Sequence, residues 1–223
     1  MALLWRSYVS IRNLLAGFAR GVLLSRVPFG HAIGCFCGSY ECHFQFGREG
    51  FVIRSFSGKT PQIAASAYVD PQAVVIGDVI IGDDSSIWPC AVVRGDCHWI
   101  RIGARTSIQD GSVLHVEQEK HPLVIGDGNV VGHRVILHGC TVESNCLIGM
   151  GSVILNGAVI GSGSVIAAGS VIAEGTVVPP GSLFMGVPGK LRRQVSAEET
   201  QRILEGAKHY VDYKNAFIAE AKR

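Results

Sequence analysis

The sequence predicts an all-β solenoid, a triangular parallel β-helix of six-residue repeats, with a C-terminal α-helix packed along it. Three observations lead to this fold class. Aliphatic residues recur at every sixth position over most of the chain, small residues recur at a fixed offset from them, and glycine occupies many of the turns. A period of six matches neither an α-helix nor an alternating strand, and is typical of a chain that turns a corner every six residues.

The aliphatic ladder runs in three sections. Its members are Ile63, Val69, Val75, Ile81, Ile87 and Val93; then Ile102, Ile108 and Leu114; then Val124, Val130, Ile136, Val142, Ile148, Ile154, Ile160, Ile166, Ile172 and Val178. Three sides of six residues make one coil, and stacked coils share an apolar core. We therefore expect every ladder residue to be buried. Three extra residues separate Val93 from Ile102, and four separate Leu114 from Val124.

A column of small residues supports this interpretation. Four positions after successive ladder residues come Cys140, Cys146, Ser152, Ala158, Ser164, Ser170 and Thr176. A corner that is pressed between two neighbouring coils has no room for a larger side chain. Cys140 and Cys146 are therefore expected to be buried thiols of a reducing compartment rather than half-cystines.

The repeats assign residues 57–190 to the β-helix domain. Residues 1–56 precede the repeats and contain no acidic residue before Glu41, while arginines are spread among apolar and serine residues. This is the composition of a mitochondrial transit peptide, and an unstructured leader is the alternative interpretation.

Residues 191–223 form the last predicted segment. Ser196 and Glu199 make a capping box, in which each side chain satisfies a backbone N–H of the first helical turn. The apolar positions that follow at helical spacing predict an amphipathic helix of about 22 residues that covers one flank of the solenoid.

Composition excludes several function classes. The formal net charge of +2 provides no basic field for nucleic acid, and no apolar run approaches the length of a membrane span. We expect a cytoplasmic protein, or a protein of the mitochondrial matrix if residues 1–56 act as a transit peptide.

The ladder also predicts which polar residues share a side of the prism. Counting six-residue steps across the two insertions stacks Val93, Leu114 and Ile136, so His115 and His138 should be neighbours one rung apart. Arg94 and Asp96 lie on the same side as these histidines. Gln109, Asp110 and His133 belong to the preceding side, where His133 should point away from the pair.

One chain would therefore hold two parts of a three-histidine site. If three subunits packed side against side, the pair from one chain could meet the third histidine of its neighbour. Three imidazoles with an open fourth position are typical of catalytic zinc.

Three runs carry a family resemblance: Val93–Asp96, Ile108–Val116 and Gly132–Cys140. They resemble the γ-class carbonic anhydrase family, from about Ser57 through the C-terminal helix. The resemblance implies a left-handed β-helix, a homotrimer, and a metal between subunits held by His115, His133 and His138. It also implies a charged network of Arg94, Asp96 and Asp110, with Gln109 orienting the reacting water.

The implied activity is reversible hydration of CO2 to bicarbonate by a hydroxide bound to Zn2+, although three histidines also accept Fe2+ or Co2+. The sequence departs from well-characterised members at Cys97, where they carry a glutamate. It also has a short loop after His115 in place of a long acidic one, which leaves Glu117 or His121 to relay protons.

Two alternative functions stay open. The ending Gly186–Lys190 is shared with hexapeptide-repeat acyltransferases, which bind acyl-CoA between subunits and use one histidine as general base. A weakly active or non-catalytic γ-carbonic-anhydrase-like assembly subunit is the other alternative.

Overall fold

The computed structural model describes residues 36–37, 40–41 and 52–220. The chain divides into two compact units, Met1–Arg48 and Glu49–Arg223. In the first unit, β1 (Phe36–Cys37) pairs with β2 (Tyr40–Glu41) in an antiparallel hairpin. Of residues 1–56, the structure otherwise describes only 52–56, so most of the segment to which the transit-peptide interpretation applies lies outside the described part of the chain.

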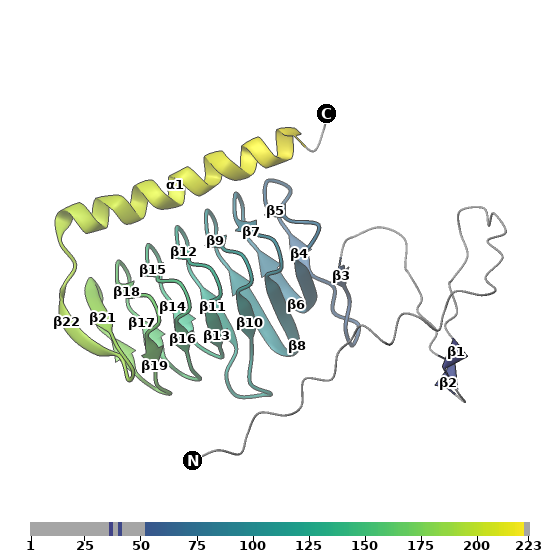
Figure 1. Cartoon of the computed structure of the whole chain (residues 1–223), viewed down its shortest axis with the longest axis horizontal. Coiled ribbons are helices and arrows are strands. Elements are labelled where there is room, and N and C mark those ends of the chain that lie inside the picture. The colour runs from purple at the N-terminus through teal and green to yellow at the C-terminus, as the bar shows by residue number, and fades with distance from the viewer. Residues whose placement is uncertain (1–35, 38–39, 42–51, 221–223) are drawn as a thin grey trace, which may run out of the picture. The chain divides into compact units, whose positions relative to one another are not determined.

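The second unit is a left-handed parallel β-helix with one helix along its flank, which confirms the predicted fold class (Figure 1). Short strands stack in parallel register on three faces, and the backbone of each coil bonds to the coils on both sides. We name each face after one of its strands: the β10 face, the β11 face and the β12 face. Strands β6 (Val74–Ile81) and β8 (Val92–Ile102) run around a corner, so each contributes to both the β10 and the β11 face.

The remaining strands each belong to one face. The β10 face contains β3 (Val52–Arg54), β10 (Val113–His115), β13 (Ile136–His138), β16 (Val153–Ile154) and β19 (Val171–Ile172). The β11 face contains β4 (Gln62–Ile63), β11 (Leu123–Ile125), β14 (Thr141–Val142), β17 (Val159–Ile160) and β20 (Val177–Val178). The β12 face contains β5 (Tyr68–Val69), β7 (Ser86–Ile87), β9 (Ser107–Ile108), β12 (Val130–Val131), β15 (Leu147–Ile148), β18 (Val165–Ile166), β21 (Ser182–Met185) and β22 (Lys190–Gln194).

The core is the column of aliphatic side chains that point inward from the three faces. Most of the ladder residues are buried in it, from Val75 to Val178. The small residues fill the corners as expected, and Cys140 and Cys146 are free, buried cysteines. Burial raises the pKa of the Cys140 thiol to about 12 and that of the Cys146 thiol to about 11, so both stay protonated at neutral pH.

The predicted ladder is wrong at three positions. The residues that follow Val124, Val130 and Ile136 take their places in the central core, namely Ile125, Val131 and Leu137. Val130 is nevertheless buried as expected, at 6% exposed, but it lies on the side of α1. The physical reason is that two aliphatic residues stand side by side at each of these positions, so that a six-residue period fits either choice. In the structure, the later residue of each pair points into the central core.

Two corrections to the stacking follow from this shift. Leu114 pairs with Leu137 rather than Ile136, and Ile108 pairs with Val131 rather than Val130. The insertion after Leu114 is consequently one residue longer than expected. The segment between Leu137 and Val142 is one residue shorter than a regular repeat, and this restores the register.

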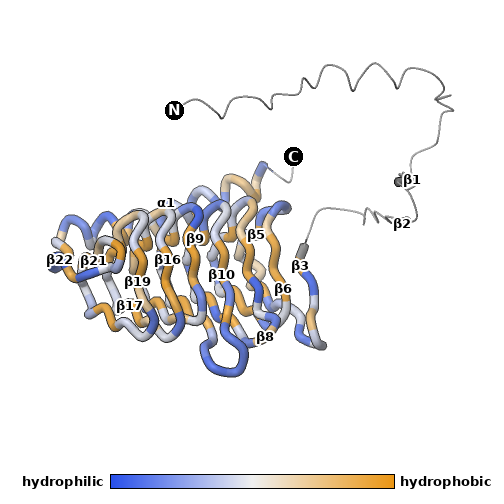
Figure 2. Tube along the Cα trace, turned by 60° about the horizontal axis from the view of Figure 1, so that its bottom comes forward, coloured by the Kyte–Doolittle hydropathy of each residue, from blue (hydrophilic) through white to orange (hydrophobic). Residues whose placement is uncertain are grey.

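The two insertions interrupt the solenoid on the same side. In β8 the extra residues bulge between Gly95, which pairs with Gly77, and Ile100, which pairs with Val79. The second insertion forms a hydrophilic loop between β10 and β11 that projects from the solenoid (Figure 2). The loop lies against Gly139 and Gly157, where an added Cβ would come within 2.7 Å and 3.1 Å of His121 atoms.

Helix α1 (Ala197–Glu220) begins at the predicted capping box. The Ser196 N–H donates to Glu199 Oε2 at 2.9 Å, and the Glu199 N–H donates to Ser196 Oγ at 3.2 Å. The helix runs along the β12 face, from the last coils back toward the first (Figure 1). Within the described part of the chain, the helical segment lacks the apolar stretch that a membrane crossing requires.

The far end of α1 is fastened to the first coils by a buried cation. The Lys214 side chain is 3% exposed, and its Nζ donates to the Ser66 carbonyl oxygen at 2.7 Å and to Asp84 Oδ1 at 2.6 Å. The ring of Phe217 packs edge-on against Trp88 nearby. A buried ammonium is tolerated here because both acceptors compensate for its lost hydration.

The close stacking of coils predicts opposite effects for one substitution at two glycines. In Gly149→Ala, the new Cβ would lie 2.4 Å from the Ala168 backbone nitrogen, so we expect a loss of about 1–3 kcal/mol. In Gly206→Ala on α1, the nearest atom is a Val130 methyl at 3.7 Å, so we expect a gain of about 1 kcal/mol. Denaturant unfolding of both variants measures the difference, and equal effects would contradict the packing described here.

Candidate metal centre

Two histidines lie side by side at the edge of the β10 face. His115 ends β10 and His138 ends β13, and the two residues are directly paired in the parallel ladder. Paired strands lie about 4.8 Å apart, which brings the rings into contact range. The His115 Nδ1 atom lies 3.1 Å from the His138 Nε2 atom.

The outer ring nitrogens of this pair each face an oxygen acceptor. His115 Nε2 donates to Asp96 Oδ1 at 3.0 Å, and His138 Nδ1 donates to Asn156 Oδ1 at 2.6 Å. Because each neutral imidazole has one proton, the inner nitrogens that face each other both carry lone pairs. Two lone pairs at this distance repel each other unless a cation lies between them.

The spacing suits a metal ion. Tetrahedral zinc with nitrogen ligands at about 2.0–2.1 Å sets those nitrogens about 3.3 Å apart, close to the 3.1 Å that separates the two rings. Burial lowers the pKa of His115 despite its bond to Asp96, which disfavours a proton in the same place. The donor set of the described residues therefore fits a metal.

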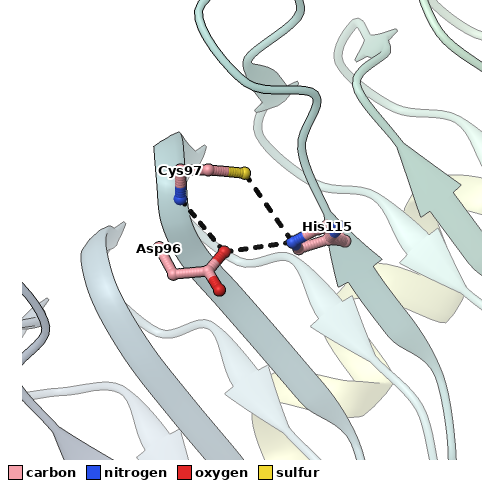
Figure 3. Close-up of side chains that lie close together, drawn as sticks. All are labelled: Asp96, Cys97 and His115. Atoms are coloured by element: carbon pink, nitrogen blue, oxygen red, sulfur yellow. Dashed lines mark hydrogen bonds and ion pairs between the residues drawn. The ribbon is translucent and has the colours of Figure 1, made fainter.

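Asp96 stands in the β8 bulge beside His115 (Figure 3), and Arg94 lies just before the bulge. Asp96 Oδ1 also accepts from the Cys97 N–H at 3.0 Å, and Asp96 Oδ2 pairs with Arg94 Nη1. Burial alone would raise the pKa of Asp96, but the bonds from Arg94 and His115 outweigh it and lower the pKa to about 2. Asp96 is consequently an anion that holds the His115 ring in one orientation.

Cys97 departs from the family pattern in the sequence, and the structure brings it to the site. Its Sγ lies 4.0 Å from His115 Nε2, and Asp96, Cys97 and His115 form a cluster of potential ligand atoms within 4.8 Å of one another (Figure 3). Burial and the Asp96 carboxylate raise the pKa of the thiol. The thiolate form that metals prefer is therefore disfavoured at neutral pH.

His133 lies at the opposite edge of the β10 face. It follows β12 at the corner, where its Nδ1 donates to Asp110 Oδ2 at 2.9 Å from the preceding coil. Gln109 is buried beside Asp110. Among residues 52–220, no group of potential ligands within one chain joins His133 to the other two histidines. The side chain is 46% exposed and points away from its own core.

Helix α1 reaches this second edge as well. Burial raises the pKa of Tyr210, and the Asp110 carboxylate raises it further. Helical spacing predicts that Tyr210 lies on the buried side of the helix, but it does not relate this residue to the site. Only the three-dimensional course of α1 brings the two segments together.

A cavity of about 380 Å³ lies beside Asn156 and the loop between β10 and β11. Its lining residues are Glu117, Lys120, His121, Asn156, Gly157, Glu174 and Gly175. Glu117 Oε2 is buried without a hydrogen-bond partner among the described residues, and His121 Nε2 lies 3.6 Å from it. Asn156 is a site residue that sequence reasoning missed, although it follows His138 by 18 positions, the length of one regular coil.

Comparisons with known proteins agree with this architecture. The family model "Bacterial transferase hexapeptide (six repeats)" matches residues 60–95 and 139–174. The chain is 44% identical over 178 residues to Protein YrdA of Escherichia coli (strain K12), which covers 77% of this chain and 97% of that protein. It is 46% identical over 161 residues to a carbonic anhydrase of Geobacillus kaustophilus (strain HTA426), covering 72% of this chain and 88% of that enzyme.

A solved structure has the same fold. The chain is similar to the crystal structure of a protein described as a putative acetyltransferase from Bacillus cereus, with a TM-score of 0.70 and 39% sequence identity over 73% of this chain and 96% of that one. Three relatives from Arabidopsis thaliana are named gamma carbonic anhydrase, mitochondrial. The extent of these matches, together with the three runs around the histidines, identifies the chain as a member of the γ-class carbonic anhydrase family.

Proposed function

We propose that this protein catalyses the reversible hydration of CO2 to bicarbonate at a metal site between subunits of a homotrimer. His115 and His138 of one subunit and His133 of its neighbour are the proposed ligands. The observation that carries the proposal is the pair of imidazole nitrogens that face each other at 3.1 Å, each with its other nitrogen bound to an oxygen acceptor.

The surface of the β10 face supports the subunit arrangement. Its strands direct one aliphatic residue of each rung outward, and Val113 and Ile136 are both 40% exposed. The other outward residues of this stripe are Val74, Val92, Val153 and Val171. A continuous apolar stripe on a regular face is typical of a protein–protein interface.

The two edges of this face are complementary. The His115 and His138 pair lies along one edge, whereas Asp110 and His133 lie along the other. A rotational assembly brings unlike edges together, because each subunit contacts its neighbours through different surfaces. His133 Nε2 is available for such a contact because its bond to Asp110 uses Nδ1.

Zn2+ is the proposed metal, with Fe2+ or Co2+ as alternatives for the same three imidazoles. When bound, such a metal lowers the pKa of a water ligand to about 7 and so supplies a nucleophile for CO2. Asp96 holds the ring of His115, and Arg94 holds Asp96. We assign to Gln109 the orientation of the reacting water, and to Arg94, Asp96 and Asp110 the charged network between subunits.

The loop between β10 and β11 is the proposed route for protons. Glu117 and His121 face each other at 3.6 Å beside the cavity. Histidine is the side chain that most often acts as a general acid or base, so His121 suits proton relay.

The cytoplasm is the proposed location of the protein. The mitochondrial matrix is the alternative, which the names of the Arabidopsis relatives favour.

An acyltransferase is the second candidate, favoured by the name of the matching family model and by the description of the similar Bacillus cereus protein as a putative acetyltransferase. Such an enzyme needs one histidine as general base and a site for acyl-CoA. The acyltransferase reaction does not require two proton-free imidazole nitrogens that face each other. A non-catalytic assembly subunit is a further alternative, which would keep the metal but lack turnover.

The first prediction concerns the ligands. His138→Ala removes one of three imidazoles, so we expect bound metal to fall to under about a tenth of the wild-type content. His98→Ala and His209→Ala are matched controls that remove histidines outside the site and should keep full occupancy. Metal analysis of protein purified without oxygen measures this, and full retention of metal in His138→Ala would contradict the ligand assignment.

The second prediction tests the division of the site between subunits. Variants His115→Ala and His133→Ala should each fail to bind metal. When they are denatured and refolded together, about a quarter of the interfaces should combine an intact pair with an intact third histidine. Metal should return at that fraction of sites, with a matching fraction of CO2 hydration. Verified mixed trimers without recovered metal would refute a site shared between subunits.

The third prediction separates the two enzymatic candidates. Stopped-flow measurement should detect hydration of CO2 by metal-loaded protein, and His138→Ala should abolish it. Acyl-CoA at millimolar concentration should neither bind nor be consumed. Binding of acyl-CoA together with metal-independent acyl transfer would favour the acyltransferase, whereas full metal occupancy without hydration would favour the assembly subunit.

A further inference from the structure

Asn156 occupies the turn that follows β16, one coil beyond His138. Its Oδ1 lies 2.6 Å from His138 Nδ1, and the side chain is partly buried between the solenoid and the cavity next to it. Neither the three runs that carry the family resemblance nor the proposed charged network contains this residue.

The contact determines which nitrogen of His138 holds the proton. An amide oxygen only accepts, so Nδ1 must be the protonated nitrogen. Nε2 then carries the lone pair, and Nε2 is the atom that faces His115 at 3.1 Å. Asp96 acts on the other ring in the same way, through Nε2 of His115. The two rings are thus oriented by different chemical groups, one an anion and one a neutral amide.

The turn itself does not require the amide side chain. Its backbone bonds run from the Ala158 N–H to the Leu155 oxygen at 3.2 Å, and from the Gly175 N–H to the Asn156 backbone oxygen at 2.9 Å. At the equivalent position of the next coil, 18 residues later, stands Glu174, which is exposed. The same turn therefore forms with a different side chain.

The preceding coil makes room for the contact between Asn156 and His138. Gly139 lies directly after His138, and a Cβ at that position would come within 2.6 Å of Asn156 Oδ1. Gly139 also has a φ of 54°, in the left-handed region. The shortened segment between Leu137 and Val142 begins here, so the irregular coil and the asparagine meet at one point.

We propose that Asn156 is a positioning residue that holds His138 in the tautomer with its lone pair on Nε2, directed at the metal. The inference rests on the proposed function, since it assigns a partner to one of the proposed ligands. Partners of this kind typically change metal affinity by about 10–100-fold when they are removed.

The test compares three variants in the full-length protein. Asn156→Leu removes the acceptor and keeps a similar volume, Asn156→Asp keeps an acceptor, and Glu174→Gln changes the equivalent turn position as a matched control. Titration with Co2+, followed by its visible absorption, measures affinity and geometry together. We expect about 10–100-fold weaker binding for Asn156→Leu, and binding within about threefold of wild type for the other two.

A second measurement does not depend on metal or on activity. The 15N resonances of histidine-labelled, metal-free protein report which ring nitrogen is protonated, and His138→Gln assigns the signals of His138. Wild-type protein should have Nδ1 of His138 protonated, and Asn156→Leu should give a mixture or the other tautomer. This readout on the wild type also applies if Asn156→Leu fails to fold.

The outcomes separate this inference from the proposed function. Unchanged Co2+ affinity in a folded Asn156→Leu variant, or Nε2 protonation in wild-type protein, would overturn the positioning role. Failure of the wild type to bind Co2+ would instead count against the proposed function. Weak binding by both Asn156→Leu and Glu174→Gln would mean that the turn as a whole, rather than the amide, governs the site, and would also overturn the positioning role.

Discussion

The parallel backbone ladder between successive coils is the constraint on which the rest of this structure depends. Each strand bonds to the coil on either side at the spacing of paired strands, about 4.8 Å. Corners that are stacked this closely admit only small side chains, and glycine where a Cβ would touch the next backbone, as at Gly149. The same ladder sets His115 opposite His138, so the chemistry of the site follows from the register.

The irregular parts of the ladder carry the polar chemistry. The bulge in β8 supplies Asp96 and Cys97, the loop after β10 supplies Glu117 and His121, and the shortened coil after Leu137 lets Asn156 reach His138. The regular coils from Val142 to Val178 repeat with scarcely a variation. They extend the core and hold the edges of the β10 face straight. In this β-helix, the regular coils form the scaffold and the irregular coils carry the candidate site, so the two lie at different positions along the axis.

Much of this arrangement could be predicted from the sequence. The period of six predicts the coil, and the count of repeats brings His115 close to His138 and keeps His133 apart. That count is one residue out at this coil, so it sets Leu137 rather than His138 opposite His115. The choice between Ile136 and Leu137 could not be predicted, because both residues are aliphatic and adjacent. Only the structure shows that Leu137 points into the core and Ile136 points outward. The roles of Asn156 and Cys97 could not be predicted for another reason. They depend on side-chain reach across an irregular coil, which a one-dimensional period does not describe.

The course of α1 has a consequence for how the molecule comes apart. Stacked repeats contact only their neighbours, so a solenoid can in principle fray coil by coil from either end. Here the helix leaves the last coil beside β22, and its far end is held by Lys214 against Ser66 and Asp84 in the first coils. Opening the first coils therefore loosens the helix, and releasing the helix uncovers the β12 face along its length. Helix α1 thus connects the first coils of the β-helix to the last, and so favours unfolding of the whole β-helix in a single cooperative step.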